Sequence, residues 1–262
     1  MKSPMRILAA ATGLMITLSA AAEPVQPPAG WTREFGVGVI ANPEFQGGSS
    51  YQLRPIPYID IRYRDQSGVK YFANVPQGIG GYVYRSGREA RGRSAVALSI
   101  APGFATRDDG VPGLEEVGPA TEARLTFTRA HGPWTAGAVF AADLGTGHEG
   151  AYVDLTFQRS GRIGQRGFWS FGPALRIVDS DYAEAQYGIR PADAPLAGLP
   201  MHDAGEGAEQ ISIGGVLSVP VHEKWRLTTV ARVGGILGDR GNSPIVESRT
   251  QAFLLIAVTR PF

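Results

Sequence analysis

The segment 36–41 comes nearest to a cofactor motif, because Gly36, Gly38 and Ala41 fit the pattern G-x-G-x-x-G/A. In dinucleotide-binding proteins this pattern follows a strand and opens a helix whose N-terminus faces the pyrophosphate. Here the segment lies within an alternating apolar stretch and ends at Pro43, which cannot continue a helix. We therefore interpret the glycines as relief of crowding on the inner face of a strand, and we expect no nucleotide or other cofactor.

Other catalytic and metal-binding side chains are sparse. The chain has no cysteine, which excludes disulfides, cysteine-ligated metals and a thiol nucleophile. Its histidines, His131, His148, His202 and His222, show no metal-ligand spacing, and we interpret them as solvated turn residues. The motif G-x-S-x-G is absent, so a catalytic serine would need partners assembled across strands. We expect no metal site and no enzyme, with a barrel enzyme acting on lipid A or peptides as the third hypothesis.

The composition is that of a packed protein with little net charge. The 262 residues carry a formal charge of +1, and 43% of them are hydrophobic. A dedicated nucleic-acid binder would present a strongly basic face, and a disordered chain would lack this apolar content. We therefore expect no nucleic-acid partner, and the length permits one large domain or two small ones.

The first residues have the layout of an export signal. Lys2 and Arg6 precede an apolar run over residues 7–18, and residues 20–22 are all alanine, as in a cleaved secretory signal peptide. The run is shorter than the ~20 residues that a membrane-spanning helix needs, so an uncleaved anchor is the less favoured alternative. The predicted organisation is a signal peptide over 1–22, a periplasmic lead-in over 23–32 and an outer-membrane β-barrel over 33–262.

The remainder of the chain alternates between apolar and polar residues. In residues 51–63 the odd positions are apolar, whereas the even positions include Arg54, Asp60 and Arg62. A period of two is typical of strands with one apolar and one polar face. A soluble sheet on a protein core and a barrel in lipid both produce this pattern. Long strands with a heavily charged polar face favour the barrel.

We predict an all-β protein, a transmembrane antiparallel up-and-down β-barrel of twelve strands. The strands are expected near 33–41, 51–63, 69–75, 79–85, 94–103, 120–129, 134–143, 150–159, 167–178, 210–219, 225–236 and 250–262. The pair 69–75 and 79–85 is the weakest, because Gly78, Gly80 and Gly81 lie in or beside it. If neither segment spans, the barrel has ten strands.

The predicted connections differ in length on the two sides. With both termini in the periplasm, the long connections 42–50, 104–119, 179–209 and 237–249 all lie outside. The periplasmic connections are short, as is typical of bacterial outer-membrane barrels. The tryptophans Trp31, Trp134, Trp169 and Trp225 each begin an odd strand, which predicts an aromatic belt on the periplasmic side. The C-terminal Phe262, on an amphipathic last strand, is similar to the signal read by the barrel assembly machinery.

A set of charged side chains is expected to face the lumen. Its members are Arg54, Asp60, Arg62, Glu122, Arg124, Asp154 and Arg176. In a narrow barrel such charges pair across the lumen, whereas in a wide one they line water and select solutes. Twelve strands lie between the filled and open limits, and we favour a filled or constricted lumen.

Several short segments together resemble the MltA-interacting protein (MipA/OmpV) family. The first stretch contains Gly36, Gly38, Pro43, Glu44, Phe45 and Gly47, the second Pro55 and Pro57, and the last Ser243 and Pro244. Asp181-Tyr182, Tyr187-Gly188 and Gly238-Asp239 add to the match, which covers nearly the whole exported chain. Phe45 stands where the family usually has tyrosine.

The resemblance implies an outer-membrane barrel. The founding member is regarded as a scaffold between a lytic transglycosylase and a bifunctional penicillin-binding protein, and other members are described as adhesins or porin-like. We therefore expect a non-enzymatic scaffold in contact with outer-membrane lipid, lipopolysaccharide and the barrel assembly machinery, with a murein hydrolase and a murein synthase as partners. The alternative is a small-solute or antibiotic channel with a charged lumen.

Overall fold

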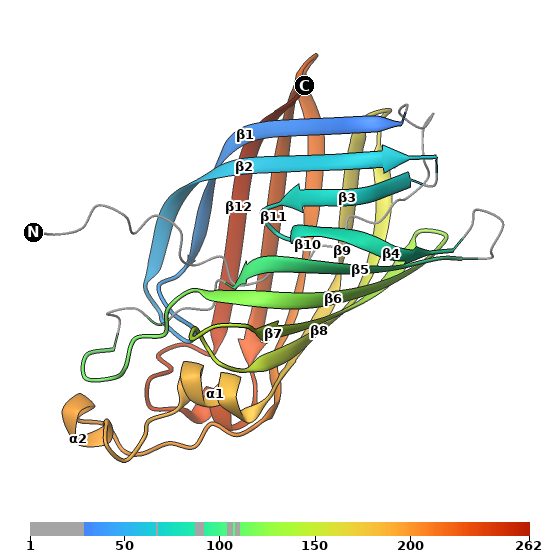
Figure 1. Ribbon diagram of the computed structural model, residues 1–262. Coiled ribbons are helices and arrows are strands. Elements are labelled where there is room, and N and C mark those ends of the chain that lie inside the picture. Colours follow the sequence, from blue (N-terminus) through green and yellow to red (C-terminus); the bar gives the residue numbers. More distant parts are fainter. Residues whose placement is uncertain (1–28, 67, 87–91, 104–106, 108–110) are drawn as a thin grey trace, which may run out of the picture.

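The computed structural model describes residues 29–66, 68–86, 92–103, 107 and 111–262. It is a closed antiparallel barrel in which each strand pairs with its sequence neighbours and β1 pairs with β12 (Figure 1). The strands are β1 (Gly30–Pro43), β2 (Tyr51–Asp65), β3 (Gly68–Asn74), β4 (Gly78–Arg85), β5 (Arg93–Gly103), β6 (Ala120–His131), β7 (Trp134–Asp143), β8 (Ala151–Ile163), β9 (Gly167–Val178), β10 (Gly207–His222), β11 (Trp225–Ile236) and β12 (Thr250–Pro261). The predicted all-β barrel of twelve strands is confirmed.

Several strands extend beyond their predicted bounds, and β1 and β10 do so at both ends. β1 begins at Gly30, which pairs with Arg64, so residues 30–32 of the expected lead-in are strand. β10 runs from Gly207 to His222 rather than over 210–219, because its pairing with β9 and β11 continues at both ends. The predicted signal peptide lies outside the described residues.

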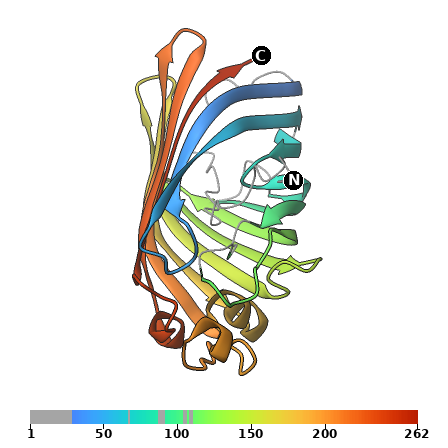
Figure 2. The same ribbon diagram turned by 90° about the vertical axis from the view of Figure 1, so that its left-hand side faces the viewer.

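The connections define two ends of the barrel. The loop end carries the long connections together with α1 (Ser180–Tyr187), α2 (Ala194–Ala197) and the 3-10 helix η1 (Gly238–Asn242) (Figures 1 and 2). The turn end carries short connections, such as 132–133 and 223–224, and the C-terminus. Among the described residues, no helix combines the length and hydropathy of a membrane span.

The β3–β4 hairpin covers only part of the barrel wall. β2 pairs with β3 over Asp60–Asp65 alone, whereas its residues 51–59 pair only with β1. Pro55 and Pro57 lie in this half of β2. Proline lacks the N–H that a second neighbouring strand would use, so an edge tolerates it.

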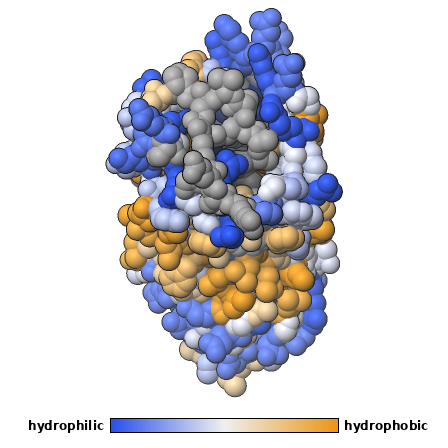
Figure 3. Space-filling model, turned by 90° about the vertical axis from the view of Figure 1, so that its right-hand side faces the viewer, coloured by the Kyte–Doolittle hydropathy of each residue, from blue (hydrophilic) through white to orange (hydrophobic). Residues whose placement is uncertain are grey.

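The two faces of the barrel differ sharply in polarity. Outward side chains such as Val37, Leu53 and Ile79 are each more than 70% exposed, and Figure 3 shows an apolar band between two polar zones. Buried polar and charged side chains face inward. This arrangement, apolar outside and polar inside, is typical of transmembrane barrels.

A hydrophobic cluster lies at the loop end rather than at mid-barrel. Its buried members are Ala141, Tyr152, Val178, Tyr182, Ala183, Tyr187, Ala204 and Ile236. They come from the ends of strands and from the long connection 179–206, which contains α1. We call residues 179–206 and 237–249 the cap. The cap therefore packs against the barrel mouth as a folded element.

Candidate functional site

The predicted lumen charges form ion pairs along the barrel wall. Arg62 pairs with Asp60 through Nε and Nη2, at 2.7 and 2.6 Å. Arg124 and Glu122 are two residues apart on β6, and their shortest N–O distance is 2.6 Å. Arg54, which is half-buried, donates to the Gln52 side chain at 2.7 Å. The partners lie on the same strand, so these pairs do not bridge the lumen as the sequence analysis expected.

Glu122 is the centre of a buried polar cluster near the loop end. Its carboxylate lies 2.7 Å from Nε of Arg124, 2.9 Å from the Tyr152 hydroxyl and 3.2 Å from Nε2 of His148. Arg124 also donates to the carbonyl oxygens of Pro76 and Pro102. The interpretation of His148 as a solvated turn residue is wrong, because its side chain is fully buried against Glu122.

A second cluster joins the barrel wall to the cap. Arg176 on β9 donates to both oxygens of Asp154 on β8, each at 2.7 Å. Nη1 of Arg176 lies 3.2 Å from the hydroxyl of Tyr182 on α1. The Tyr187 hydroxyl donates to Glu209 at 2.7 Å. Burial raises the pKa of Tyr182 and of Tyr187, so both hydroxyls stay protonated.

Arg240 holds the strand that follows the cap. Its guanidinium donates to the carbonyl oxygens of Ala204, Gly205, Glu206 and Ala208, at 2.7 to 3.2 Å. Four carbonyl acceptors around one cation fix the path of the chain into β10. Hydrogen bonds from Arg240 thus hold the connection 237–249 against the connection 179–206.

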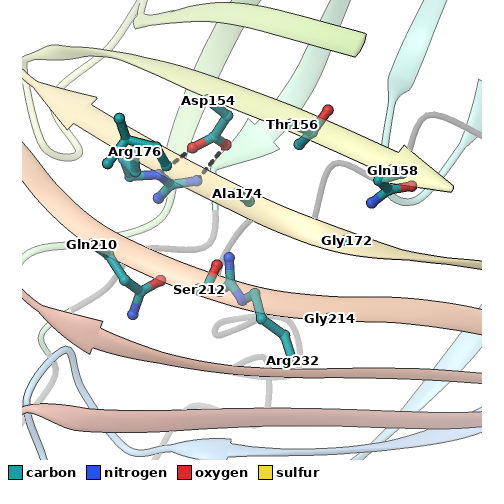
Figure 4. Close-up of a pocket in the computed structure, with 11 residues that line it drawn as sticks. Asp154, Thr156, Gln158, Gly172, Ala174, Arg176, Gln210, Ser212, Gly214 and Arg232 are labelled. Atoms are coloured by element: carbon teal, nitrogen blue, oxygen red, sulfur yellow. Dashed lines mark hydrogen bonds and ion pairs between the residues drawn. The ribbon is translucent and has the colours of Figure 1, made fainter. Parts of the chain in front are cut away.

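A hollow in the inner wall of the barrel lies on the turn-end side of the second cluster. It opens toward the lumen, and its lining includes Thr156, Gln158, Ser212 and Arg232 (Figure 4). The floor is made of small residues, Gly172 and Gly214 among them. The Asp154–Arg176 pair borders its loop-end side.

The predicted aromatic belt maps to the turn end. Trp31, Trp134 and Trp225 are exposed and Trp169 is half-exposed. Each stands in the first three residues of an odd strand. Arg159 lies over the Trp134 ring at 5.8 Å, and such amphipathic pairs suit a membrane–water boundary.

Phe262 lies beside the barrel seam, at the same end of the barrel as the four tryptophans. Its backbone N–H donates to the Arg33 carbonyl, and its ring lies 5.8 Å from that of Phe35. Arg260, which interrupts the apolar alternation of β12, lies over the rings of Trp225 and Phe262. Its cation therefore lies among aromatic rings at the turn end.

Comparison with known proteins decides the family. A family model described as "MltA-interacting protein MipA" matches residues 35–262. The chain belongs to this family. The family is named for binding rather than for catalysis. No curated protein matches the chain. Among solved structures, the chain is similar to the crystal structure of Ail, the attachment invasion locus protein of Yersinia pestis. The two sequences are 9% identical and the TM-score is 0.22, and the match covers 90% of this chain and 100% of Ail.

The MipA-family motifs from opposite ends of the chain meet at the loop end. The Gly47 carbonyl accepts from the N–H groups of Glu247 and Ser248. Gly47 has φ +93°, and a Cβ there would lie 2.7 Å from the side chain of Val246. Ser243 donates to the Tyr187 carbonyl at 2.6 Å. The motifs thus serve to close the loop end.

The first MipA-family motif also closes the barrel wall. Gly36 and Gly38 face inward on β1, opposite Thr259 and Ala257 of β12. A Cβ at Gly36 would overlap the Val258 carbonyl oxygen. The interpretation of these glycines as relief of crowding on the inner face agrees with this contact. Phe45, at the position where the family usually has tyrosine, is buried.

Sequence reasoning missed the polar residues that complete the lumen site. Tyr152, Glu209 and Arg232 lie on inward positions of strands, and the period of two places them there once the strand bounds are known. Tyr182 and Tyr187 were noted only as parts of family motifs. Nothing in the local sequence signals that they pack into the mouth.

Proposed function

We propose that this protein is an outer-membrane barrel that anchors the lytic transglycosylase MltA at its turn end, in the periplasm. The family name supports MltA as the partner. The apolar band on the outer face supports insertion in a bilayer (Figure 3). The murein synthase expected from the family resemblance would join through the same assembly.

The observation that carries the proposal is the charge of the turn end. The exposed cationic side chains in or near its connections are Arg33, Lys70, Arg129, Arg159, Arg162, Arg166 and Lys224. Among the described residues there, Glu223 is the exposed acid. A concentrated positive rim attracts an acidic partner surface and speeds its encounter. We call these seven side chains the turn-end rim.

The loop end carries the opposite charge. Its exposed acids are Glu44, Glu115, Glu116, Glu149, Asp181, Asp203, Glu206, Asp239 and Glu247, against the exposed cations Arg190 and Arg249 in the described segments. A partner drawn to the rim would be repelled by this end. The charge difference therefore gives docking a direction along the barrel axis.

The packing of the cap favours an anchor over the alternative of a small-solute channel. Tyr182 and Tyr187 are fully buried at the mouth, and their hydroxyls bind lumen-facing residues. A wide aqueous path through the loop end would need these contacts to break. The third hypothesis, a barrel enzyme, has no observation in its favour.

Binding of purified MltA to the detergent-folded barrel tests the proposal. We expect binding that weakens with salt, and a loss of about five- to tenfold in affinity for R162S/R166S. The matched control is R190S/R249S, which removes two cations from the loop end and is expected to leave binding unchanged. Absence of binding, or equal loss in both variants, would contradict the proposal.

A further inference from the structure

The hollow in the inner wall combines small residues with polar side chains that face it. The residues of its floor are paired neighbours on adjacent strands and form one row across the barrel wall. Gly172 of β9 pairs with Gly214 of β10, which pairs with Arg232 of β11. Gln158 of β8 adjoins Gly172 on the other side. Two glycines in the middle of the row leave room between an arginine and a glutamine (Figure 4).

Arg232 has free hydrogen-bonding capacity at this place. Its guanidinium makes no hydrogen bond or ion pair with the residues that the structure describes. Five N–H groups in a planar fork therefore remain for a ligand. The nearby carboxylates are engaged elsewhere, because both Asp154 oxygens accept from Arg176, and Glu209 accepts from Tyr187.

A second uncommitted group lies at the other end of the row. The side chain of Gln158 is 4% exposed, and its Oε1 has no hydrogen-bond partner in the described structure. A buried acceptor without a donor costs free energy. A ligand that donates a hydroxyl or amide hydrogen to Oε1 removes that cost. Ser212 and Thr156 add hydroxyls from the next row toward the loop end, in which both pair with Ala174.

We propose that the hollow binds a small hydroxylated carboxylate. The carboxylate pairs with the Arg232 fork in the bidentate geometry that guanidinium favours. The hydroxyls of the ligand reach Gln158 and the Ser212–Thr156 side. A monoanion adds one negative charge beside Arg232, whereas a phosphate dianion would add two in the neighbourhood of Asp154 and Glu209. This inference does not depend on the proposed role in binding MltA.

Calorimetric titration of the detergent-folded barrel with D-glucuronate, D-glucose and inorganic phosphate tests the site. We expect glucuronate to bind at least about tenfold more tightly than glucose, because glucose lacks the carboxylate. R232Q is expected to abolish this preference. R54Q is the matched control, since Arg54 faces the same lumen from β2 and pairs with Gln52 outside the hollow.

Each result decides for or against the site. Equal binding of glucuronate and glucose, or no binding of glucuronate, would overturn the proposal. Tighter binding of phosphate, or equal loss in R232Q and R54Q, would show general anion attraction by the lumen and would also overturn it. If R232Q does not fold, S212L tests the same hollow by filling it. Retained glucuronate binding in folded S212L would contradict the proposal.

Discussion

The hydroxyl of Tyr182 lies 3.2 Å from Nη1 of Arg176, while Nε and Nη2 of the same guanidinium bind Asp154. One arginine of the barrel wall thus binds both a lumen carboxylate and helix α1 of the cap. Because all three side chains are buried, the cap and the lumen charges form one packed unit.

Removing the Tyr182 hydroxyl should loosen the cap. Y182F deletes a hydrogen bond to a charged group, which is worth about 1.5–3 kcal/mol. We expect amide hydrogen exchange in α1 to become about tenfold faster, while the barrel strands stay protected. Y84F is the control, because Tyr84 is exposed on the outer face. Unchanged exchange in α1 would show that the hydrogen bond between Tyr182 and Arg176 does not stabilise the cap.

Neutralising Glu122 should destabilise the loop end of the barrel. E122Q leaves Arg124 buried without its counter-charge, and removing one partner of a buried pair costs about 3 kcal/mol. We expect a lower free energy of unfolding in denaturant titration. E206Q changes an exposed glutamate of the cap and should have no such effect. Equal stability of E122Q and the wild type would refute the importance of the cluster.

The cap should be more stable in mild acid than at neutral pH. Burial, a hydrogen bond that the protonated Glu184 carboxyl donates to the Asp203 carboxylate, and the negative charge of Asp203 raise the pKa of Glu184, against the lowering effect of the Ala204 N–H. A carboxyl whose folded pKa lies above its unfolded value contributes stability below the unfolded pKa, and this is lost as pH rises through the folded pKa. The window thus begins near pH 4.5.

E184Q tests this pH dependence. Glutamine keeps an oxygen for the Ala204 N–H, which lies 2.7 Å from Glu184 Oε1, but it does not ionise. We expect α1 in the wild type to lose protection from hydrogen exchange between pH 4.5 and neutral pH, after correction for the intrinsic exchange rate. The variant should lose much less. Parallel curves for the two proteins would contradict the assignment to Glu184.

A side chain at Gly36 should hinder barrel closure. The Cβ of G36A would meet the Val258 carbonyl oxygen and the Cα of Thr259, and overpacking of this kind costs about 1–3 kcal/mol. We expect a smaller folded fraction after refolding in detergent. G235A is the matched control, because a Cβ at Gly235 has no neighbour within 4 Å. Equal folded fractions would remove the steric explanation of the first motif.

Deletion of Phe262 should affect assembly more than stability. Phe262 is 71% exposed, so its loss removes little packing from the folded barrel. If the residue is a signal for the assembly machinery, the variant should accumulate less in outer membranes yet refold normally in detergent. Normal amounts of the variant without Phe262 in outer membranes would contradict a role of this residue as an assembly signal.

The barrel could be predicted from the sequence because its rule is local. A period of two along each segment gives the number of strands, as the segment 51–63 illustrates. Even the weak pair, β3 and β4, forms. Strand ends were less predictable. At Gly30 and His222, pairing with a neighbouring strand decides where the strand ends.

The cap and the hollow could not be predicted because their contacts join distant segments. His148 has the sequence surroundings of a solvated turn, yet it is buried against Glu122, 26 residues away. Arg232 alternates with apolar residues and so belongs to the lumen, but its lack of a partner depends on how Arg176 binds Asp154. The burial of His148 and the lack of a partner for Arg232 can be known only when the side chains of several strands are placed together.

Photocrosslinking in living cells tests the central claim, that the turn-end rim binds MltA. A photoreactive phenylalanine analogue replaces Gln165 in the 164–166 turn, and in a second strain it replaces the exposed Asn242 of the cap. We expect a covalent adduct with MltA from position 165 and none from position 242. No adduct at 165, or equal adducts at both positions, would contradict the claim.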